Sequence, residues 1–215
     1  MKTITSVIIL HFLLPLSLIA QYDKMAEEML KKVEIKYKSL KSFKAEFTYT
    51  GEMAATEEVE TQKGNITVKG SNKVILDLFD QVIYIDGQTQ WTHLVEENEV
   101  DIMDYDPDEE EFSPNRMYDL YKRGFKYIYV EDINENGKVY HVIDLVPEDR
   151  NKSFFKIKLF INKADDTIAA WRIYEKNANK YEYRINAFFP NIKVEDSDFK
   201  FDATKYKGIE VVDLR

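Results

Sequence analysis

The residues best suited to bind a metal ion lie in one acidic segment, residues 104–111, which reads DYDPDEEE. Asp104, Asp106 and Asp108 have the alternate spacing with which a calcium-binding loop presents its carboxylate ligands. The sixth position of such a loop needs a glycine for a sharp turn, but Glu109 stands there, and no glutamate occupies the twelfth position. We therefore interpret the segment as a solvated acidic loop, with cation binding as the alternative.

Catalytic chemistry has little support elsewhere in the chain. Beyond residue 20 the only histidines are His93 and His141, and no serine lies in a nucleophile elbow. The chain has just 7 glycines, and none forms a phosphate-binding loop. His93 lies in an expected strand beside Trp91, where a surface or rim position is favoured over a role as a base. We predict that the protein is not an enzyme and needs no cofactor or metal.

The first twenty residues have the pattern of a cleavable signal peptide. Lys2 precedes an apolar run over residues 4–19, and the small Ala20 comes before the polar Gln21. A retained membrane anchor is the alternative, but Pro15 and the short run argue against it, because a spanning helix needs about twenty apolar residues. Residues 1–20 are therefore predicted to be a signal peptide, and residues 21–215 to form a single domain.

Composition limits the partners of the exported chain. There is no cysteine, so no disulfide can form and no lipid can be attached through a cysteine thioether. The net charge of −9 makes nucleic acid and anionic membrane surfaces poor partners. A domain without disulfides must be stabilised by one substantial core.

Two short segments have helical periodicity. Residues 22–41 carry an apolar stripe at spacings of three and four, formed by Met25, Met29, Leu30, Val33, Tyr37 and Leu40. A second helix is expected to start at Pro114 and to end at Gly124, with Met117, Leu120 and Tyr121 on its apolar side.

Nearly all the remaining chain alternates between apolar and polar residues, which predicts β-strands. The expected strands cover 43–53, 59–69, 74–79, 82–86, 88–95, 99–103, 126–133, 138–146, 154–161, 167–175 and 180–189. Asp86-Gly87 predicts a two-residue hairpin turn, and residues 134–137 predict another. Phe155, Ile157, Leu159 and Ile161 are expected to share one face.

These elements predict a mainly β (α+β) fold, in which a single curved antiparallel sheet forms a half-open barrel covered by the N-terminal helix and the short mid-chain helix. A sheet of this size must bury its apolar face against something. Two short helices cannot fill the concave face of a strongly curved sheet tightly, so we expect a partly vacant apolar interior.

Several motifs, in their order along the chain, resemble a known family. The motifs are LKSFKAEF at 40–47, GNITVK at 64–69, DGQTQW at 86–91, FKF at 199–201 and GIEVVD at 208–213. Together they resemble the periplasmic outer-membrane lipoprotein carrier family (LolA-like proteins) over essentially the whole exported chain. Family members often carry an Arg-Pro pair after the Val-Lys, whose arginine latches the lid helix, but Gly70-Ser71 occupies these positions here.

The resemblance implies a periplasmic chaperone that binds the acyl chains of lipoproteins in a hydrophobic cavity and delivers them to the outer membrane. It further implies an inner-membrane lipoprotein exporter and an outer-membrane acceptor as partners; we expect a monomer. The alternatives are a regulatory module that senses lipid or outer-membrane protein, and a general periplasmic lipid-binding protein on the same half-barrel.

The alternating faces supply a candidate set for such a cavity, with ordinary core packing as the alternative for each member. The candidate wall residues are Phe47, Ile66, Val68, Leu76, Leu78, Ile83, Ile85, Trp91, Phe155, Ile157, Leu159, Trp171, Ile173, Tyr183 and Ile185. The candidate lid residues are Met25, Met29, Val33, Tyr37, Met117 and Leu120. Methionine adapts to irregular surfaces, which suits a lid.

Overall fold

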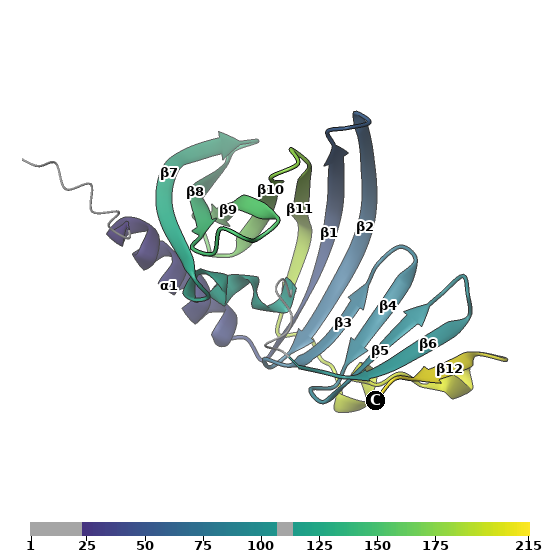
Figure 1. Ribbon diagram of the computed structural model, residues 1–215. Helices are drawn as coiled ribbons and strands as arrows, with labels where there is room; N and C mark the ends of the chain where they lie inside the picture. The colour runs from purple at the N-terminus through teal and green to yellow at the C-terminus, as the bar shows by residue number, and fades with distance from the viewer. Residues whose placement is uncertain (1–22, 107–113) are drawn as a thin grey trace, which may run out of the picture.

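The computed structural model describes residues 23–106 and 114–215 (Figure 1). The expected signal peptide lies outside these residues, as do Asp108 and the glutamates of the acidic segment. The helix α1 spans Lys24–Lys38, and the 3₁₀ helix η1, between the sixth and seventh strands, spans Pro114–Lys122. Two short 3₁₀ helices, η2 Asp196–Phe199 and η3 Ala203–Lys205, lie near the C-terminus. Gly124, with φ of 74°, follows η1 as the sequence predicts.

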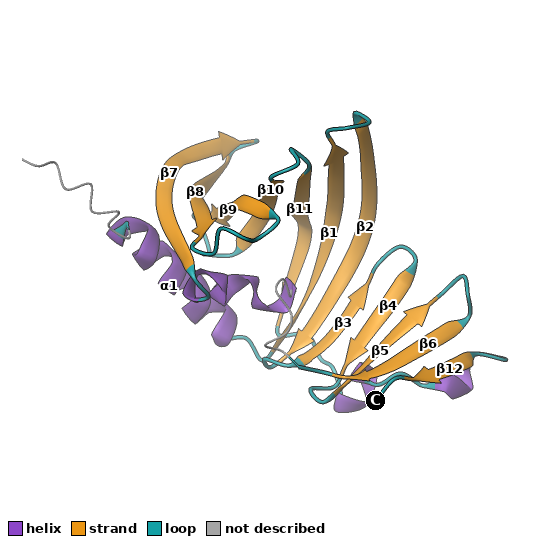
Figure 2. Ribbon diagram, in the orientation of Figure 1, coloured by secondary structure: helices purple, strands orange, loops and turns teal. Residues whose placement is uncertain are grey.

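Twelve strands form one curved sheet, which confirms the predicted fold class. The strands are β1 Ser42–Met53, β2 Glu58–Lys69, β3 Lys73–Asp77, β4 Gln81–Ile85, β5 Thr89–Leu94, β6 Glu99–Asp104, β7 Phe125–Glu135, β8 Lys138–Pro147, β9 Phe154–Asn162, β10 Ile168–Glu175, β11 Lys180–Pro190 and β12 Glu210–Asp213. Their order is β12-β6-β5-β4-β3-β2-β1-β11-β10-β9-β8-β7. Every pair is antiparallel except β12 with β6, and the two edges, β12 and β7, do not pair with each other. The barrel is therefore unclosed, with α1 and η1 on its concave side (Figures 1 and 2).

Turn residues set the hairpins. Asn136 and Gly137 both have positive φ, 52° and 80°, and connect β7 to β8 as a two-residue turn of the kind that matches strand twist. Asp86-Gly87 does begin a hairpin, but the connection has three residues, 86–88, and not the expected two. The carboxylate of Asp86 accepts hydrogen bonds from the backbone N–H groups of Gln88 and Thr89, which fixes the longer loop.

Bulges reverse the alternation in the second half of the sheet. The register of β9 with β10 slips next to Phe155, that of β10 slips at Ala169, and that of β11 with β1 slips at Asn186. One extra residue turns every later side chain of a strand to the other face. These three positions decide which side chains of β9, β10 and β11 point into the barrel.

The C-terminal segment, residues 191–215, covers the convex face of β3–β6 before ending as β12 (Figure 1). Phe201 contacts Tyr84 and His93, with ring centroids 5.8 and 5.3 Å apart, and Tyr206 lies 4.4 Å from the His93 ring. His93 is consequently only 4% exposed, which corrects the expected surface or rim position. Burial lowers the pKa of His93 below 6.5.

Candidate functional site

An apolar cavity lies between the helical segments and the concave face of the sheet. The floor comes from β1, β2, β10 and β11, and the roof from the C-terminal end of α1 and the middle of η1. The lining residues are Tyr37, Phe43, Ala45, Phe47, Ile66, Met117, Tyr118, Ile168, Trp171, Tyr183, Ile185 and Phe188. None of these side chains is charged and most of their surface is aliphatic or aromatic, so the lining suits an apolar ligand.

The cavity is small, with a volume of about 30 Å³. That volume holds one or two water molecules, and an acyl chain needs far more room. The partly vacant interior that the sequence predicts is therefore limited to this small cavity, because aromatic rings fill the remaining space under the helices. Tyr37 stands at the centre of these rings, with centroids 5.5 Å from Phe43, 5.4 Å from Tyr118 and 5.7 Å from Phe188.

Polar contacts hold α1 over the cavity at its two ends. At the N-terminus the carboxylate of Asp23 accepts hydrogen bonds from Met25 N–H in α1 and from Tyr129 N–H in β7, both at 2.9 Å. At the other end, the hydroxyl oxygen of Tyr37 accepts a hydrogen bond from the backbone N–H of Ile168 at 3.2 Å. Ile168 is the first residue of β10 and comes directly before the bulge at Ala169.

A third contact, the Glu34 clamp, ties α1 to η1. Glu34 is 7% exposed, and its carboxylate accepts hydrogen bonds from Lys38 in α1 and from Tyr121 and Lys122 in η1, at 2.6, 2.7 and 2.5 Å. Burial alone would raise the pKa of Glu34, but these donors outweigh it and lower the pKa from 4.5 to about 2. The two pieces of the roof are thus joined by a buried charge.

An open side groove of about 240 Å³ adjoins the cavity. Its lining residues are Phe47, Tyr49, Gln62, Lys63, Leu78, Asp80, Gln81 and Tyr183. Phe47 and Tyr183 belong to both walls, so they separate the closed apolar cavity from the open and more polar groove.

The structure brings seven of the predicted site residues into the cavity lining: Phe47, Ile66, Trp171, Tyr183, Ile185, Tyr37 and Met117. Others pack in the core beside the cavity: Val68, Leu76, Leu78, Ile83 and Ile85 next to β1 and β2, and Ile157, Leu159, Ile173, Met29, Val33 and Leu120 next to β7–β10. Leu78 also lines the side groove.

Three predicted residues lie elsewhere. Phe155 is 49% exposed, because the bulge beside it gives the inward position to Phe154. Trp91 pairs with Tyr84, whereas the inward Ile83 and Ile85 pair with Thr92 and Gln90, so Trp91 lies on the convex face.

Met25 is the third exception. It is 49% exposed, since the buried stripe of α1 runs through Ala26, Leu30 and Val33. Met25 therefore forms no part of the roof.

Five lining residues were not among the predicted ones. Phe43 and Ala45 alternate in phase with Phe47, so the strand pattern contained the signal for them. Ile168 and Phe188 owe their inward positions to the bulges at Ala169 and Asn186, which no local pattern marks. Tyr118 was missed because the apolar side of η1 was assigned to Met117, Leu120 and Tyr121.

The histidines that were considered for catalysis do not belong to this site. His141 pairs with Asp132 at 2.6 Å, and neither histidine lines the cavity or the groove. Within residues 23–106 and 114–215, no three His, Cys, Asp or Glu side chains are arranged to hold a metal ion. In the same residues, no helix is long and apolar enough to cross a membrane. Gly70, where the family often has arginine, is in a turn with φ of 63° and carries no latch.

Comparison with known proteins supports the resemblance. A family model described as outer membrane lipoprotein carrier protein LolA matches residues 38–202. No curated protein matches the chain. Among solved structures, an uncharacterized conserved protein from Thermus thermophilus has a similar fold, with 12% identity, a TM-score of 0.61, and coverage of 88% of this chain and 99% of that chain.

Two further structures resemble the chain more loosely. A putative outer membrane lipoprotein-sorting protein domain from Vibrio parahaemolyticus is 12% identical, with a TM-score of 0.46 and coverage of 82% and 96%. The lipoprotein LppX of Mycobacterium tuberculosis is 11% identical, with a TM-score of 0.49 and coverage of 80% and 100%. The family match spans well over half of the sequence, and the chain therefore belongs to the LolA family of outer membrane lipoprotein carrier proteins.

Proposed function

We propose that the protein is a monomeric periplasmic carrier, not an enzyme, which shelters the acyl chains of lipoproteins and delivers them to the outer membrane. It takes its cargo from an inner-membrane exporter and gives it to an outer-membrane acceptor. The observation that carries the proposal is the uncharged cavity under α1 and η1, in a chain that belongs to a lipoprotein carrier family.

The energetics suit such a cargo. Removing a methylene from water is worth about 0.8 kcal/mol, so a sixteen-carbon chain represents roughly 12 kcal/mol before losses. The aromatic rings around the cavity of about 30 Å³ keep the rest of the concave apolar face from water. The roof side chains Tyr37, Met117 and Tyr118 then have to move aside for the acyl chain, and the flexible thioether of Met117 suits that movement.

The test is to purify the full-length protein from its own cell envelope and to identify extracted lipid by mass spectrometry. Acylated lipoprotein in the extract supports the proposal. Free lipid alone would identify a general lipid-binding protein, and an empty protein that binds a membrane regulator would identify a regulatory module. Depletion of the protein that leaves lipoproteins correctly sorted would exclude the carrier role.

A matched pair of variants on β11 tests the cavity itself. Ile185→Glu puts a charge into the lining, whereas Phe189→Glu puts the same charge on the convex face, where Phe189 is exposed. Ile185→Glu should lose uptake of a fluorescent fatty acid, and Phe189→Glu should retain it, with folding of both checked by circular dichroism. A charge at Ile157 would test folding instead, because that side chain is fully buried in the core.

A further inference from the structure

The side groove differs from the cavity in the chemistry of its walls. By the pairing of β1 with β2, Gln62 lies opposite Tyr49 on the concave face, and Gln81 opens β4 on the same face. Lys63 pairs with Thr48 and so, by alternation, directs its ammonium group to the convex face. The polar side chains of the groove are therefore two carboxamides, the phenols of Tyr49 and Tyr183, and one carboxylate, that of Asp80 in the β3–β4 turn.

These polar groups are available to a ligand. Tyr49, Gln62 and Gln81 are all half-buried. The amide nitrogen of Gln62 donates to Glu60, which leaves its oxygen free to accept, and neither Tyr49 nor Gln81 makes a side-chain hydrogen bond in the described part of the chain. A carboxamide both donates and accepts, so these groups match ester and amide groups better than a free charge.

Two aromatic side chains stand between the groove and the cavity. The rings of Phe47 and Tyr183, which belong to both walls, lie 6.0 Å apart, and Tyr183 stacks on Trp171 at 5.0 Å. Phe47 lies against the backbone of Gly64, where a Cβ atom would come within 2.5 Å of the ring. An acyl chain that displaces Phe47 would therefore pass from the groove straight into the cavity.

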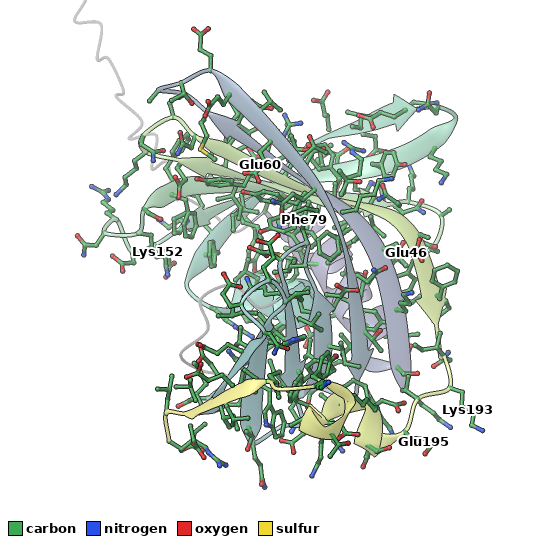
Figure 3. All side chains as sticks on the ribbon, turned by 90° about the vertical axis from the view of Figure 1, so that its right-hand side faces the viewer. Glu46, Glu60, Phe79, Lys152, Lys193 and Glu195 are labelled. Atoms are coloured by element: carbon green, nitrogen blue, oxygen red, sulfur yellow. The ribbon has the colours of Figure 1, made fainter. Side chains whose placement is uncertain are left out.

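An exposed aromatic residue adjoins the groove residues of the β3–β4 turn. Phe79, which Figure 3 labels, is 73% exposed in the β3–β4 turn. Its neighbours in the sequence, Leu78 and Asp80, both line the groove. An exposed aromatic ring beside a half-polar groove favours an amphipathic occupant over a purely polar one.

We infer that the side groove binds the uncharged polar junction of an acylated ligand, where ester and amide groups join the acyl chains to the head. The acyl chains occupy the cavity beyond Phe47, and Gln62, Gln81 and Tyr49 hydrogen-bond the ester and amide groups. This inference rests on the proposed acyl-binding function and assigns it a second subsite.

The experiment compares two probes by titration calorimetry: palmitic acid, and a synthetic lipopeptide with a dipalmitoylglyceryl-cysteine at its N-terminus. The double variant Gln62→Leu/Gln81→Leu removes both carboxamides while keeping similar side-chain volumes. It should bind the lipopeptide about tenfold more weakly, since two hydrogen bonds of modest net worth are lost, and should bind palmitic acid as the unmodified protein does.

Gln90→Leu is the matched control. Gln90 lies on the concave face of β5 but lines neither the cavity nor the groove, so this variant should bind both probes normally. Lipopeptide affinity in the double variant equal to that of Gln90→Leu would overturn the inference and leave the proposed function intact. Failure of the unmodified protein to bind either probe would overturn both.

Discussion

Replacing Glu34 with glutamine should loosen the joint between the two pieces of the roof. The substitution removes the negative charge but keeps the shape, so Tyr121 can still donate to the remaining oxygen while Lys38 and Lys122 lose their ionic partner. Because Glu34 is buried, the lost interaction cannot be replaced fully by water.

The expected loss of stability can be worked out from the lowered pKa of Glu34. A carboxyl group whose pKa falls from 4.5 to about 2 on folding gains roughly 3 kcal/mol, since each pKa unit is worth about 1.4 kcal/mol. The lysine side chains are 58% and 52% exposed, so solvent screens their part of the interaction. We therefore expect Glu34→Gln to lower the free energy of unfolding by about 1.5 kcal/mol at pH 7.

The stabilisation by Glu34 should decrease as the pH falls. The contribution of a carboxyl group with a lowered pKa is complete above pH 4.5 and is lost as the pH falls toward 2. Urea unfolding at several pH values should show the full difference between the unmodified protein and Glu34→Gln at pH 7 and a much smaller one at pH 3.

Glu28→Gln is the control, because Glu28 is exposed on the same helix and makes no side-chain bond in the described part of the chain. Equal stability of Glu34→Gln and Glu28→Gln at pH 7, or a difference that does not change with pH, would refute the reasoning.

Three other predictions concern the cavity and the C-terminal segment. Tyr37→Phe leaves the backbone N–H of Ile168 without its acceptor and should cost about 1–2 kcal/mol in urea unfolding; an unchanged midpoint would show that the hydroxyl contributes nothing. Gly64→Ala places a Cβ 2.5 Å from the Phe47 ring and should destabilise the fold by about 1–3 kcal/mol, with a displaced Phe47 in a crystal structure as the check. His93 must stay neutral to remain buried, so as the pH falls below 6.5 the C-terminal segment should detach and hydrogen exchange in β12 should rise; His93→Phe should abolish that rise.

The sequence predicts the strands well because their signals are local. Alternation and turn residues place β1, β2 and β7–β11 within a few residues of their observed bounds. It predicts the inward faces less well, because a bulge is a single extra residue without a reliable sequence mark. The bulges near Phe155, Ala169 and Asn186 therefore account for one wrong site residue and for two of the five that were missed.

Trp91 was misplaced for a different reason. Trp91 of β5 lies opposite Tyr84 of β4. In β4 the residues on both faces are apolar, with Val82 and Tyr84 on one side and Ile83 and Ile85 on the other. Alternation cannot tell inside from outside when both faces are buried. The convex face is buried here because the C-terminal segment returns to cover it, and this long-range contact could not be deduced from the strand itself.

The contacts of α1 indicate which part of the roof has to open for a cargo. Ala26, Leu30 and Val33 are almost completely buried in the core, and lifting them would expose apolar surface at about 25 cal/mol per Å². Tyr37 reaches the cavity instead and is held at its tip by one hydrogen bond, which is worth about 1 kcal/mol net. In the proposed carrier, the cavity therefore makes room for an acyl chain by displacing Tyr37 and its η1 neighbours while the rest of α1 stays docked. Glu34 lies one helical turn before Tyr37, between the fixed and the movable parts, so its clamp is placed to control how far the roof opens.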